Sequence, residues 1–301
     1  MKPITAFTGA TGLNIVEDPV RIPAQRDGKS DLQVAINVSI DQSYRVNSRR
    51  GVTQLQSGNF HSLFCDGGDC FVVKGDSLYQ VAADGSLTGI RSGLTEGARM
   101  DYAQVGDWTY YVNGFEKGII QGGISSVWGE GSYFGPTTNR HFSGPVPGHH
   151  IAQFDSRILI SQDNVLWWSE PFNFDLFNQA ESFVQFHTKI LMIKPVEAGV
   201  FVSTSRNTYF LEGKLPKKWV ARKVAGYPAV EWTDAIDYIT AADLGFEAVG
   251  GCAVWASKEG AIMGFPSGQI ANLNKRKVIY PETAMTGFGG LIGFNYIHGV
   301  K

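Results

Sequence analysis

The chain has 301 residues, of which 43% are hydrophobic and only 18% are charged, and its formal net charge is −2. This composition excludes an intrinsically disordered chain, which is poorer in aromatic residues and richer in charge, and a strongly basic nucleic-acid-binding domain. No run of about 18 apolar residues could form a membrane-spanning helix, and residues 1–12 lack the apolar core of a signal peptide.

The first 55 residues differ from the rest and are predicted to form an N-terminal leader with its own strands. Residues 32–40 read as a strand that leads through a hairpin into residues 44–52. We expect residues 34–40 to close the fold by pairing with the last sheet, or to leave it and contact a neighbouring molecule.

From residue 56 to residue 301 one pattern recurs: a Gly or Asp turn, an apolar strand, a polar turn, and a second strand that usually carries an aromatic residue. Five copies are anchored 38 to 52 residues apart, at Cys70, Trp108, Arg157, Val200 and Cys252. A sixth, partial copy lies at residues 289–294. A recurrence of about 40–50 residues with several short strands is typical of propeller blades.

This pattern predicts an all-β protein, a β-propeller of about six (five to seven) four-stranded blades. The crowded innermost strand of a blade suits small residues such as those at 250–254. An irregular β-sandwich is the alternative, although a sandwich would show turns every ~8–12 residues without the longer period. Residues 234–242 are the best candidate for a short helix, and residues 129–148, rich in Gly, Pro, Ser and Asn, are predicted to form a long loop.

The three cysteines do not form a recognisable framework. Cys65 and Cys70 are close enough in sequence to bridge a turn, but we expect a reduced pair, and no set of Cys and His residues completes a zinc site. His149 and His150 are adjacent, so on a strand their side chains point to opposite faces, and Asp155 is the only carboxylate close by. A metal site is therefore not predicted, although a loop could bring the pair together.

Two groups of carboxylates could in principle form a glycosidase pair, which needs two carboxyl groups about 5 Å or about 6.5–9.5 Å apart. The candidates are Glu231, Asp234 and Asp237, and Glu170 with Asp175. Asp234 could instead cap the short helix. The turn at residues 257–260 departs from the sialidase repeat, and no catalytic or phosphate-binding motif is present. We predict no enzymatic activity and no catalytic, cofactor-binding or metal-binding residues.

Three short basic clusters, at residues 49–50, 217–218 and 275–277, are interpreted as solvated turns. The near-neutral charge gives little counterion-release driving force for tight DNA binding, but it suits a surface that DNA must slide past. Trp167 and Trp168 are consecutive, so they cover both faces of a strand and could serve either an interface or packing between sheets.

The opening of the chain is similar to the start of the tail-hub β-propellers of short-tailed phages, known as nozzle or stabilisation proteins. The likeness lies in residues 12–14, 18–21, 32, 35–41, 44–46 and 49–52. Residues 168–171, with Phe174, also resemble a strand end in these proteins. Elsewhere the likeness is one of period and strand character.

The resemblance implies a structural protein of the virion. Such proteins form a ring, typically six-fold, below the portal and adaptor, and the ring lines or seals the channel through which DNA leaves. We therefore expect self-association, contacts with other tail or connector proteins, and location in the phage tail, with the host cytoplasm as the place of assembly. The family brings no catalytic residues and no cofactor, and its members carry further domains that this chain lacks.

The alternative function is a glycan-binding or glycan-hydrolysing propeller of a tail or secreted protein. Its site would lie at the axis of the ring, where Glu231 and Asp237 are the first candidates.

Overall fold

The computed structural model describes residues 9–22, 28–41, 43–49, 51, 53–66, 68–129, 142–237, 250–274, 277–292 and 295–301. Within these ranges the chain is all-β, as predicted, and the only helical segments are two single 3₁₀ turns, η1 (Pro19–Arg21) and η2 (Pro216–Lys218).

Five four-stranded antiparallel sheets follow one another along the chain. Sheet 1 comprises β5 (Phe60–Asp66), β6 (Asp69–Lys74), β7 (Ser77–Val81) and β8 (Leu87–Arg91). Sheet 2 comprises β9 (Asp101–Val105), β10 (Trp108–Val112), β11 (Lys117–Gln121) and β12 (Ile124–Ser126). Sheet 3 comprises β14 (His150–Phe154), β15 (Arg157–Gln162), β16 (Val165–Trp168) and β18 (Phe183–Gln185). Sheet 4 comprises β19 (Ile190–Val196), β20 (Gly199–Thr204), β21 (Thr208–Glu212) and β22 (Val220–Ala225). Sheet 5 comprises β23 (Ala235–Asp237), β24 (Cys252–Ser257), β25 (Gly260–Gly264) and β26 (Ile270–Asn272).

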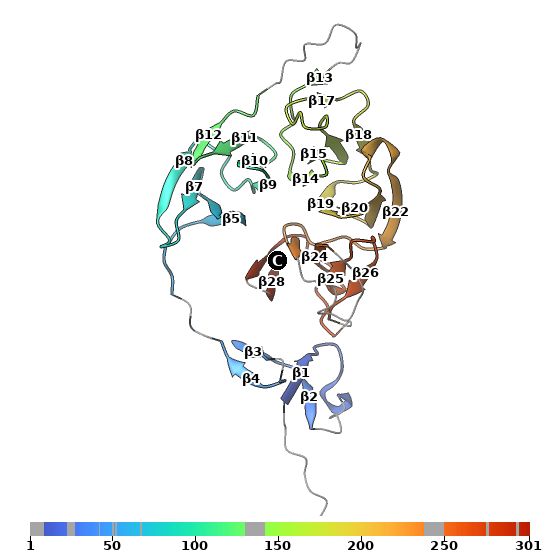
Figure 1. The fold of residues 1–301 in the computed structure, drawn as a ribbon. Helices are drawn as coiled ribbons and strands as arrows, with labels where there is room; N and C mark the ends of the chain where they lie inside the picture. The colour runs from blue at the N-terminus through green and yellow to red at the C-terminus, as the bar shows by residue number, and fades with distance from the viewer. Residues whose placement is uncertain are drawn as a thin grey trace, which may run out of the picture.

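In every sheet the strands are hydrogen-bonded in chain order, and the sheets stand side by side along an arc. Figure 1 shows the first strands β5, β9, β14 and β19 on the inner side of the arc and the last strands β8, β12 and β22 on its outer side. The predicted repeat corresponds to the second and third strand of each sheet. The expectation that residues 250–254 form an innermost strand was wrong, because β24 is the second strand of its sheet and β23 is the first.

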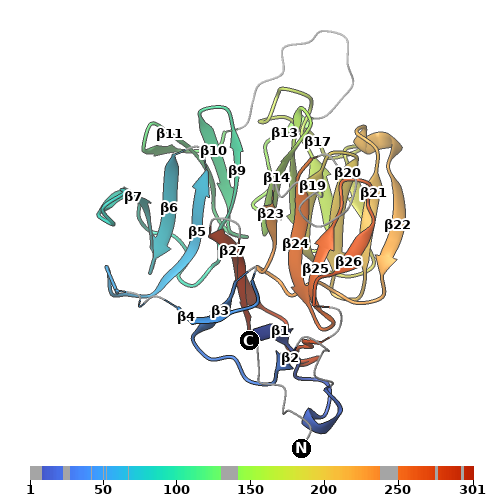
Figure 2. The same cartoon turned by 60° about the horizontal axis from the view of Figure 1, so that its bottom comes forward.

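Four two-stranded sheets complete the described fold. β27 (Gly287–Ile292) pairs with β28 (Asn295–Val300), and β13 (Phe142–Ser143) pairs with β17 (Phe177–Asn178). β1 (Gly9–Leu13) pairs in parallel with β2 (Lys29–Leu32), and β3 (Val38–Ile40) forms a hairpin with β4 (Val46–Ser48). We call residues 9–22 and 28–49 the N-terminal module, which lies below the arc of sheets in Figures 1 and 2.

The expected pairing of residues 34–40 with the last sheet is not observed, because β3 pairs with β4 instead. A local turn favours the hairpin: the Asp41 carboxylate accepts hydrogen bonds from the backbone N–H groups of Ser43 (2.8 Å) and Arg45 (2.9 Å). Such a turn closes a short loop, whereas pairing with a distant sheet would close a loop of most of the chain at a larger entropic cost.

The predicted helix at residues 234–242 is also not observed where the structure describes it. Residues 235–237 form β23, in which Ile236 lies opposite Ala253 of β24, and residues 238–242 lie outside the described residues. The unpaired edge of β24 offers these residues a ladder of backbone hydrogen bonds, and this non-local partner overrides a weak helix propensity. Of the predicted loop at residues 129–148, residues 130–141 likewise lie outside the described residues.

Each pair of neighbouring sheets encloses its own hydrophobic cluster. Tyr111 packs with residues of sheet 1, whereas Tyr110 packs with residues of sheet 3, since successive side chains on a strand point to opposite faces. Trp167 and Trp168 divide in the same way, toward the clusters on the two faces of sheet 3. The consecutive aromatic residues therefore serve packing between sheets, which was one of the two predicted roles.

Cys65 and Cys70 form a disulfide, so the expectation of a reduced pair was wrong. They face each other directly across the β5–β6 hairpin, and this register brings their side chains together.

Replacing Cys65 and Cys70 together by serine should lower the free energy of unfolding by roughly 2 kcal/mol, the value that loop-closure entropy gives for so short a loop. Denaturant titration of the variant and of the wild-type protein with and without a reducing agent would measure this. The reduced wild-type protein should match the variant, and equal stability of all three samples would contradict the prediction.

Candidate functional site

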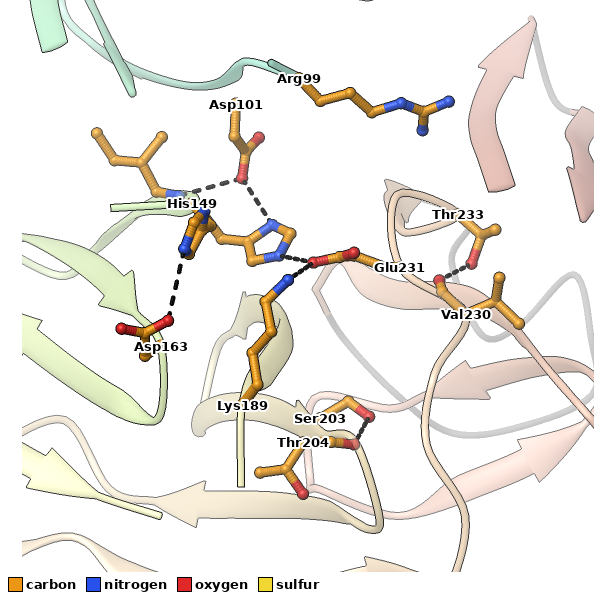
Figure 3. Close-up of polar contacts among 12 residues, drawn as sticks. Arg99, Asp101, His149, Asp163, Lys189, Ser203, Thr204, Val230, Glu231 and Thr233 are labelled. Atoms are coloured by element: carbon orange, nitrogen blue, oxygen red, sulfur yellow. Dashed lines mark hydrogen bonds and ion pairs between the residues drawn. The ribbon is translucent and has the colours of Figure 1, made fainter. Parts of the chain in front are cut away.

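Charged side chains from sheets 2 to 5 meet where the inner strands begin. Asp101 and His150 are the first residues of β9 and β14, and Lys189 directly precedes β19. Because every sheet starts with its inner strand, residues far apart in sequence are brought to one place (Figure 3). The inner charged cluster consists of Asp101, His150, Lys189, Lys194, Glu231 and Asp234.

The histidine is the centre of this cluster. The side chain of His150 is only 2% exposed; its Nδ1 lies 3.6 Å from Oδ2 of Asp101, and its Nε2 lies 3.4 Å from Oε1 of Glu231. The same Glu231 oxygen accepts a hydrogen bond from Nζ of Lys189 at 3.0 Å, as Figure 3 shows. Asp101 also accepts the backbone N–H of Ile151 at 3.1 Å. One buried imidazole therefore connects carboxylates from two other sheets.

A second ion pair lies in the same region. Nζ of Lys194, on β19, is 2.8 Å from Oδ2 of Asp234, and both side chains are largely buried. Burial acts to lower the pKa of Lys194, but the negative charges of Asp234 and Asp101 raise it above its usual range. The lysine is therefore charged although it lies within a mostly buried strand.

The three groups of the histidine centre hold one another in their charged forms. Burial acts to lower the pKa of His150, but the adjacent carboxylates of Asp101 and Glu231 outweigh it and raise that pKa to about 9. Burial acts to raise the pKa of Asp101, but His150 and Lys194 hold it below its usual range. Burial acts in the same way on the pKa of Glu231, which His150 and Lys189 hold below its usual range. At neutral pH the centre is a positive charge between two negative charges.

Because the pKa of His150 is higher in the folded protein than in an unfolded chain, its protonation stabilises the fold below about pH 6.5, and this contribution is lost as the pH rises through about 9. Between pH 6 and pH 9.5 the wild-type protein should lose about 3 kcal/mol more stability than the His150→Gln variant. Denaturant titrations at the two pH values would measure the difference. His187 is exposed, so the control variant His187→Gln should lose as much stability between the two pH values as the wild-type protein. An equal loss in His150→Gln and in the wild-type protein would contradict the prediction.

The lowered carboxylate pKa values of Asp101 and Glu231 have the opposite consequence in acid. Their contribution to stability is present above the ordinary carboxylate range and is lost as the pH falls through it. The cluster is therefore most stabilising between about pH 5 and 6.5.

Trp232 covers the cluster on one side. Its ring centroid lies 4.5 Å from that of His150, and the Arg99 guanidinium lies 5.9 Å from the same Trp ring. Trp232 has a φ of 69°, an unfavourable conformation for a bulky residue. Arg99 also donates a hydrogen bond to the carbonyl of Gly287 in β27. These contacts hold the strained residue in place and connect the cluster to β27.

The pKa directions in the cluster differ from the one that a glycosidase acid needs. A glycosidase acid needs a raised pKa, so that it is protonated when the substrate binds, whereas Asp101 and Glu231 both have lowered pKa values. Each of these carboxylates already faces a cation. In the described part of the chain, no group of three or more His, Cys, Asp or Glu residues is arranged to hold a metal ion.

Among the residues singled out from the sequence, His150, Glu231 and Asp234 come together, although they had been considered for two different kinds of site. His149 points away, and its Nε2 lies 3.9 Å from Oδ1 of Asp163. Asp175 lies in the segment between β16 and β17, outside the cluster, and its carboxylate accepts a hydrogen bond from the indole N–H of Trp128 at 2.9 Å.

The remaining candidates have other positions. Glu170 pairs through its backbone with Asn173, and Asp155 lies in the turn between β14 and β15. The side chain of Asp237 lies outside the described residues. The hydroxyl of Ser257 donates a hydrogen bond to the carbonyl of Gly260 within the β24–β25 turn, so the segment compared with the sialidase repeat is a β-hairpin turn.

Sequence reasoning missed three members of the cluster, Asp101, Lys189 and Lys194. Lys194 carried a signal that could have been used, because it interrupts the apolar strand at residues 190–196. A lysine in such a strand is expected to have a partner.

The basic clusters are partly solvated turns, as predicted. Lys218 is exposed, and Lys217 forms an ion pair with Glu181 at 2.8 Å in which both side chains are about half exposed. Lys277 differs from this prediction: its Nζ lies 2.7 Å from Oδ2 of Asp31, so it anchors the N-terminal module to the segment after β26. Arg50, Lys275 and Arg276 lie outside the described residues.

No helix among the described residues has the length and apolar character required to cross a membrane. Neither a protein-family model nor a curated protein matches the sequence.

Several solved structures are similar to this chain in fold. BBS1N, solved in complex with ARL6DN, has 11% identity and a TM-score of 0.53, and the match covers 88% of this chain and 84% of that one. The WD40 β-propeller domain of Doa1 has 9% identity and a TM-score of 0.44, with 72% and 69% of the two chains covered. The extracellular domain of the hybrid two-component system BT4673 from B. thetaiotaomicron has 9% identity and a TM-score of 0.47 over 79% of this chain, which spans only 30% of that protein's chain. At such low identities the likeness concerns the fold alone: this is an all-β chain whose structural neighbours include WD40 propellers.

Proposed function

We propose that this chain is a structural component of a phage virion, a tail-hub or nozzle protein whose β-propeller of six sheets lines or seals the DNA exit channel and connects neighbouring tail proteins. The proposal assigns a mechanical role, in which DNA passes the ring without sequence-specific contacts. It needs no cofactor and no catalytic residue.

The positions of β27 and β28 support a six-sheet arrangement. β27 contacts β23, the first strand of sheet 5, and β28 contacts β24, the second strand of that sheet. β27 and β28 therefore lie beside sheet 5 as a first and a second strand would. Tyr296 of β28 packs on the cluster that contains Cys252 and Met263. In the proposed arrangement, β27 and β28 form the inner half of a sixth sheet that continues the arc.

The observation that carries the proposal is the exposure of the segment in which the phage resemblance lies. Large apolar side chains of the N-terminal module face solvent, and they include Ile15 (50% exposed), Val20 (92%), Val34 (69%) and Ile36 (79%). Among the described residues, none of this module belongs to the five hydrophobic clusters between the sheets. A concentration of exposed apolar side chains marks a surface that other proteins cover.

The inner charged cluster suits the same role. Ion pairs join the inner strands of sheets 2 to 5 at the side of the arc that would surround a channel. Hydrogen-bonded, paired charges hold these strands in one arrangement and leave few groups to react or to bind a passing polyanion.

Mass spectrometry of purified virions and cryo-electron microscopy of their tails would test the proposal. We expect the chain in mature particles, as a ring around the channel, and expect particles made without its gene to lose DNA or fail to eject it. Its absence from purified particles would refute the proposal.

A further inference from the structure

Phe172 is held in the open on a short turn between β16 and β17. Its side chain is 80% exposed, and its φ of 57° is unfavourable for a bulky residue. Backbone hydrogen bonds fix the turn: the N–H of Phe172 donates to the carbonyl of Ser156 at 2.8 Å, and the N–H of Glu170 donates to the carbonyl of Leu176 at 2.9 Å. Phe172 belongs to none of the five hydrophobic clusters of the described residues, so packing within the chain does not account for the strain.

This combination is typical of a residue that anchors another molecule. Backbone strain persists where the surrounding structure imposes it, and it is concentrated at sites that bind or clamp ligands. An aromatic side chain on a fixed backbone loses little conformational entropy when a partner's pocket buries it. The matching surface would be a pocket lined by apolar and aromatic side chains.

A groove with these properties lies between the last strands of sheets 3 and 4, and we call it the outer groove. Its volume is about 510 Å³, which is within the ~300–1,000 Å³ of ordinary binding pockets. The rings of Trp168 and Trp219 lie 5.6 Å apart, edge to face, and Phe183 is 39% exposed. Val184 and Pro216 complete the apolar lining. Aromatic walls of this kind favour a further aromatic ring.

We propose that Phe172 of one copy of this chain inserts into the outer groove of a second copy. The inference rests on the proposed function in one respect, the self-association expected of a ring component, and it names the two surfaces that make the contact.

Charge complementarity argues for a second copy as the occupant of the groove. Residues 212–223, which form one wall, contain four lysines, one arginine and one glutamate. Glu181 faces Lys217 from the other wall at 2.8 Å and leaves a net charge of +3 around the groove. Lys214, Lys218 and Lys223 are exposed and form no ion pair with a described residue. The groove is therefore open to an anionic partner.

The surroundings of Phe172 carry the opposite charge. Its hydrogen bond to Ser156 brings residues 155–157 beside residues 170–175. Together these two segments contain Asp155, Glu170 and Asp175 against Arg157, a net charge of −2. An apolar anchor within an anionic surface thus matches an apolar groove within a cationic one, and the charges would bring the two surfaces together in one orientation.

Sedimentation velocity of the full chain, with matched variants, tests this inference. Phe172→Asn should raise the dissociation constant of the self-assembly about 30-fold or more, as expected for a central anchor residue. It should not lower the midpoint of unfolding, because asparagine tolerates a positive φ. Phe115 is 64% exposed in the turn between β10 and β11, so Phe115→Asn should leave the assembly unchanged.

The same measurement can overturn the inference in two ways. A wild-type protein that stays monomeric at all concentrations would do so. An assembly that Phe172→Asn and Phe115→Asn weaken equally, or that neither weakens, would also do so.

Crosslinking between different copies locates the contact. One full-length chain carries Asn173→Cys, beside the anchor, and the other carries Leu215→Cys, beside the groove, where Leu215 is 53% exposed. A short bismaleimide should join the two introduced thiols, and adding Phe172→Asn to the first chain should abolish the product. Ser86→Cys, in an exposed turn of sheet 1, should give no product in place of Asn173→Cys.

The outcomes separate this inference from the proposed function. Absence of the interchain crosslink in a protein that is present in virions would overturn the inference alone. A crosslink that depends on Phe172, in a protein absent from virions, would support the inference and refute the proposed function alone.

Discussion

Replacing Lys194 by methionine should lower the free energy of unfolding by about 3–5 kcal/mol, because the change leaves a buried carboxylate without its cation. The side chains of Lys194 and Asp234 are 18% and 10% exposed, and their charged atoms lie 2.8 Å apart. Water can do little to compensate the remaining charge of Asp234. Equilibrium denaturation, followed by tryptophan fluorescence, would measure the loss.

The chain contains a matched control. Lys217 and Glu181 also lie 2.8 Å apart, but both side chains are about half exposed, so Lys217→Met should cost less than about 1 kcal/mol. The double variant Lys194→Met/Asp234→Leu should recover much of the stability, since it removes both charges. Equal losses for Lys194→Met and Lys217→Met would show that the inner charged cluster does not stabilise the fold.

Trp255→Ala should also cost about 3–5 kcal/mol, through the cavity it leaves between sheets 4 and 5. Trp255 is fully buried, and its ring lies 5.4 Å from that of Phe201. The packing is tight enough that a Cβ at Gly264 would come within 2.6 Å of the Phe201 ring. Neighbouring side chains therefore have little freedom to fill the space, and thermal and chemical denaturation should both report the loss.

Two variants separate the cavity from other effects. Trp255→Phe should cost clearly less, because the indole N–H of Trp255 makes no hydrogen bond to any described residue. Trp108→Ala removes a side chain that is 41% exposed, so it too should cost less. If Trp108→Ala were as damaging as Trp255→Ala, burial between the sheets would not explain the effect.

The repeated strands could be predicted because their signal is local. Each copy is a second and third strand joined by a short turn, and second strands such as β20 and β24 are buried along their whole length. An apolar run between turn residues marks such strands in sequence. Fourth strands were not separated from their surroundings, because strands such as β18 and β22 are largely exposed and carry no continuous apolar run.

The candidate site could be predicted only in part. His150, Glu231 and Asp234 were noticed as reactive residue types, but nothing in their order indicated that they meet, since 80 residues lie between His150 and Glu231. The pKa directions follow from that meeting and from burial, both of which are properties of the folded chain. The Cys65–Cys70 disulfide depended in the same way on a register that the spacing allowed but did not require.

By itself, the sequence determined the all-β class and the tandem order of the sheets, because turn residues and apolar runs act over a few neighbouring positions. The tertiary structure alone decided which charges pair at the inner strands, that β3 turns back on β4, and that β27 pairs with β28. These outcomes depend on contacts between residues far apart in the chain, whose free energies are set by burial and distance rather than by local sequence.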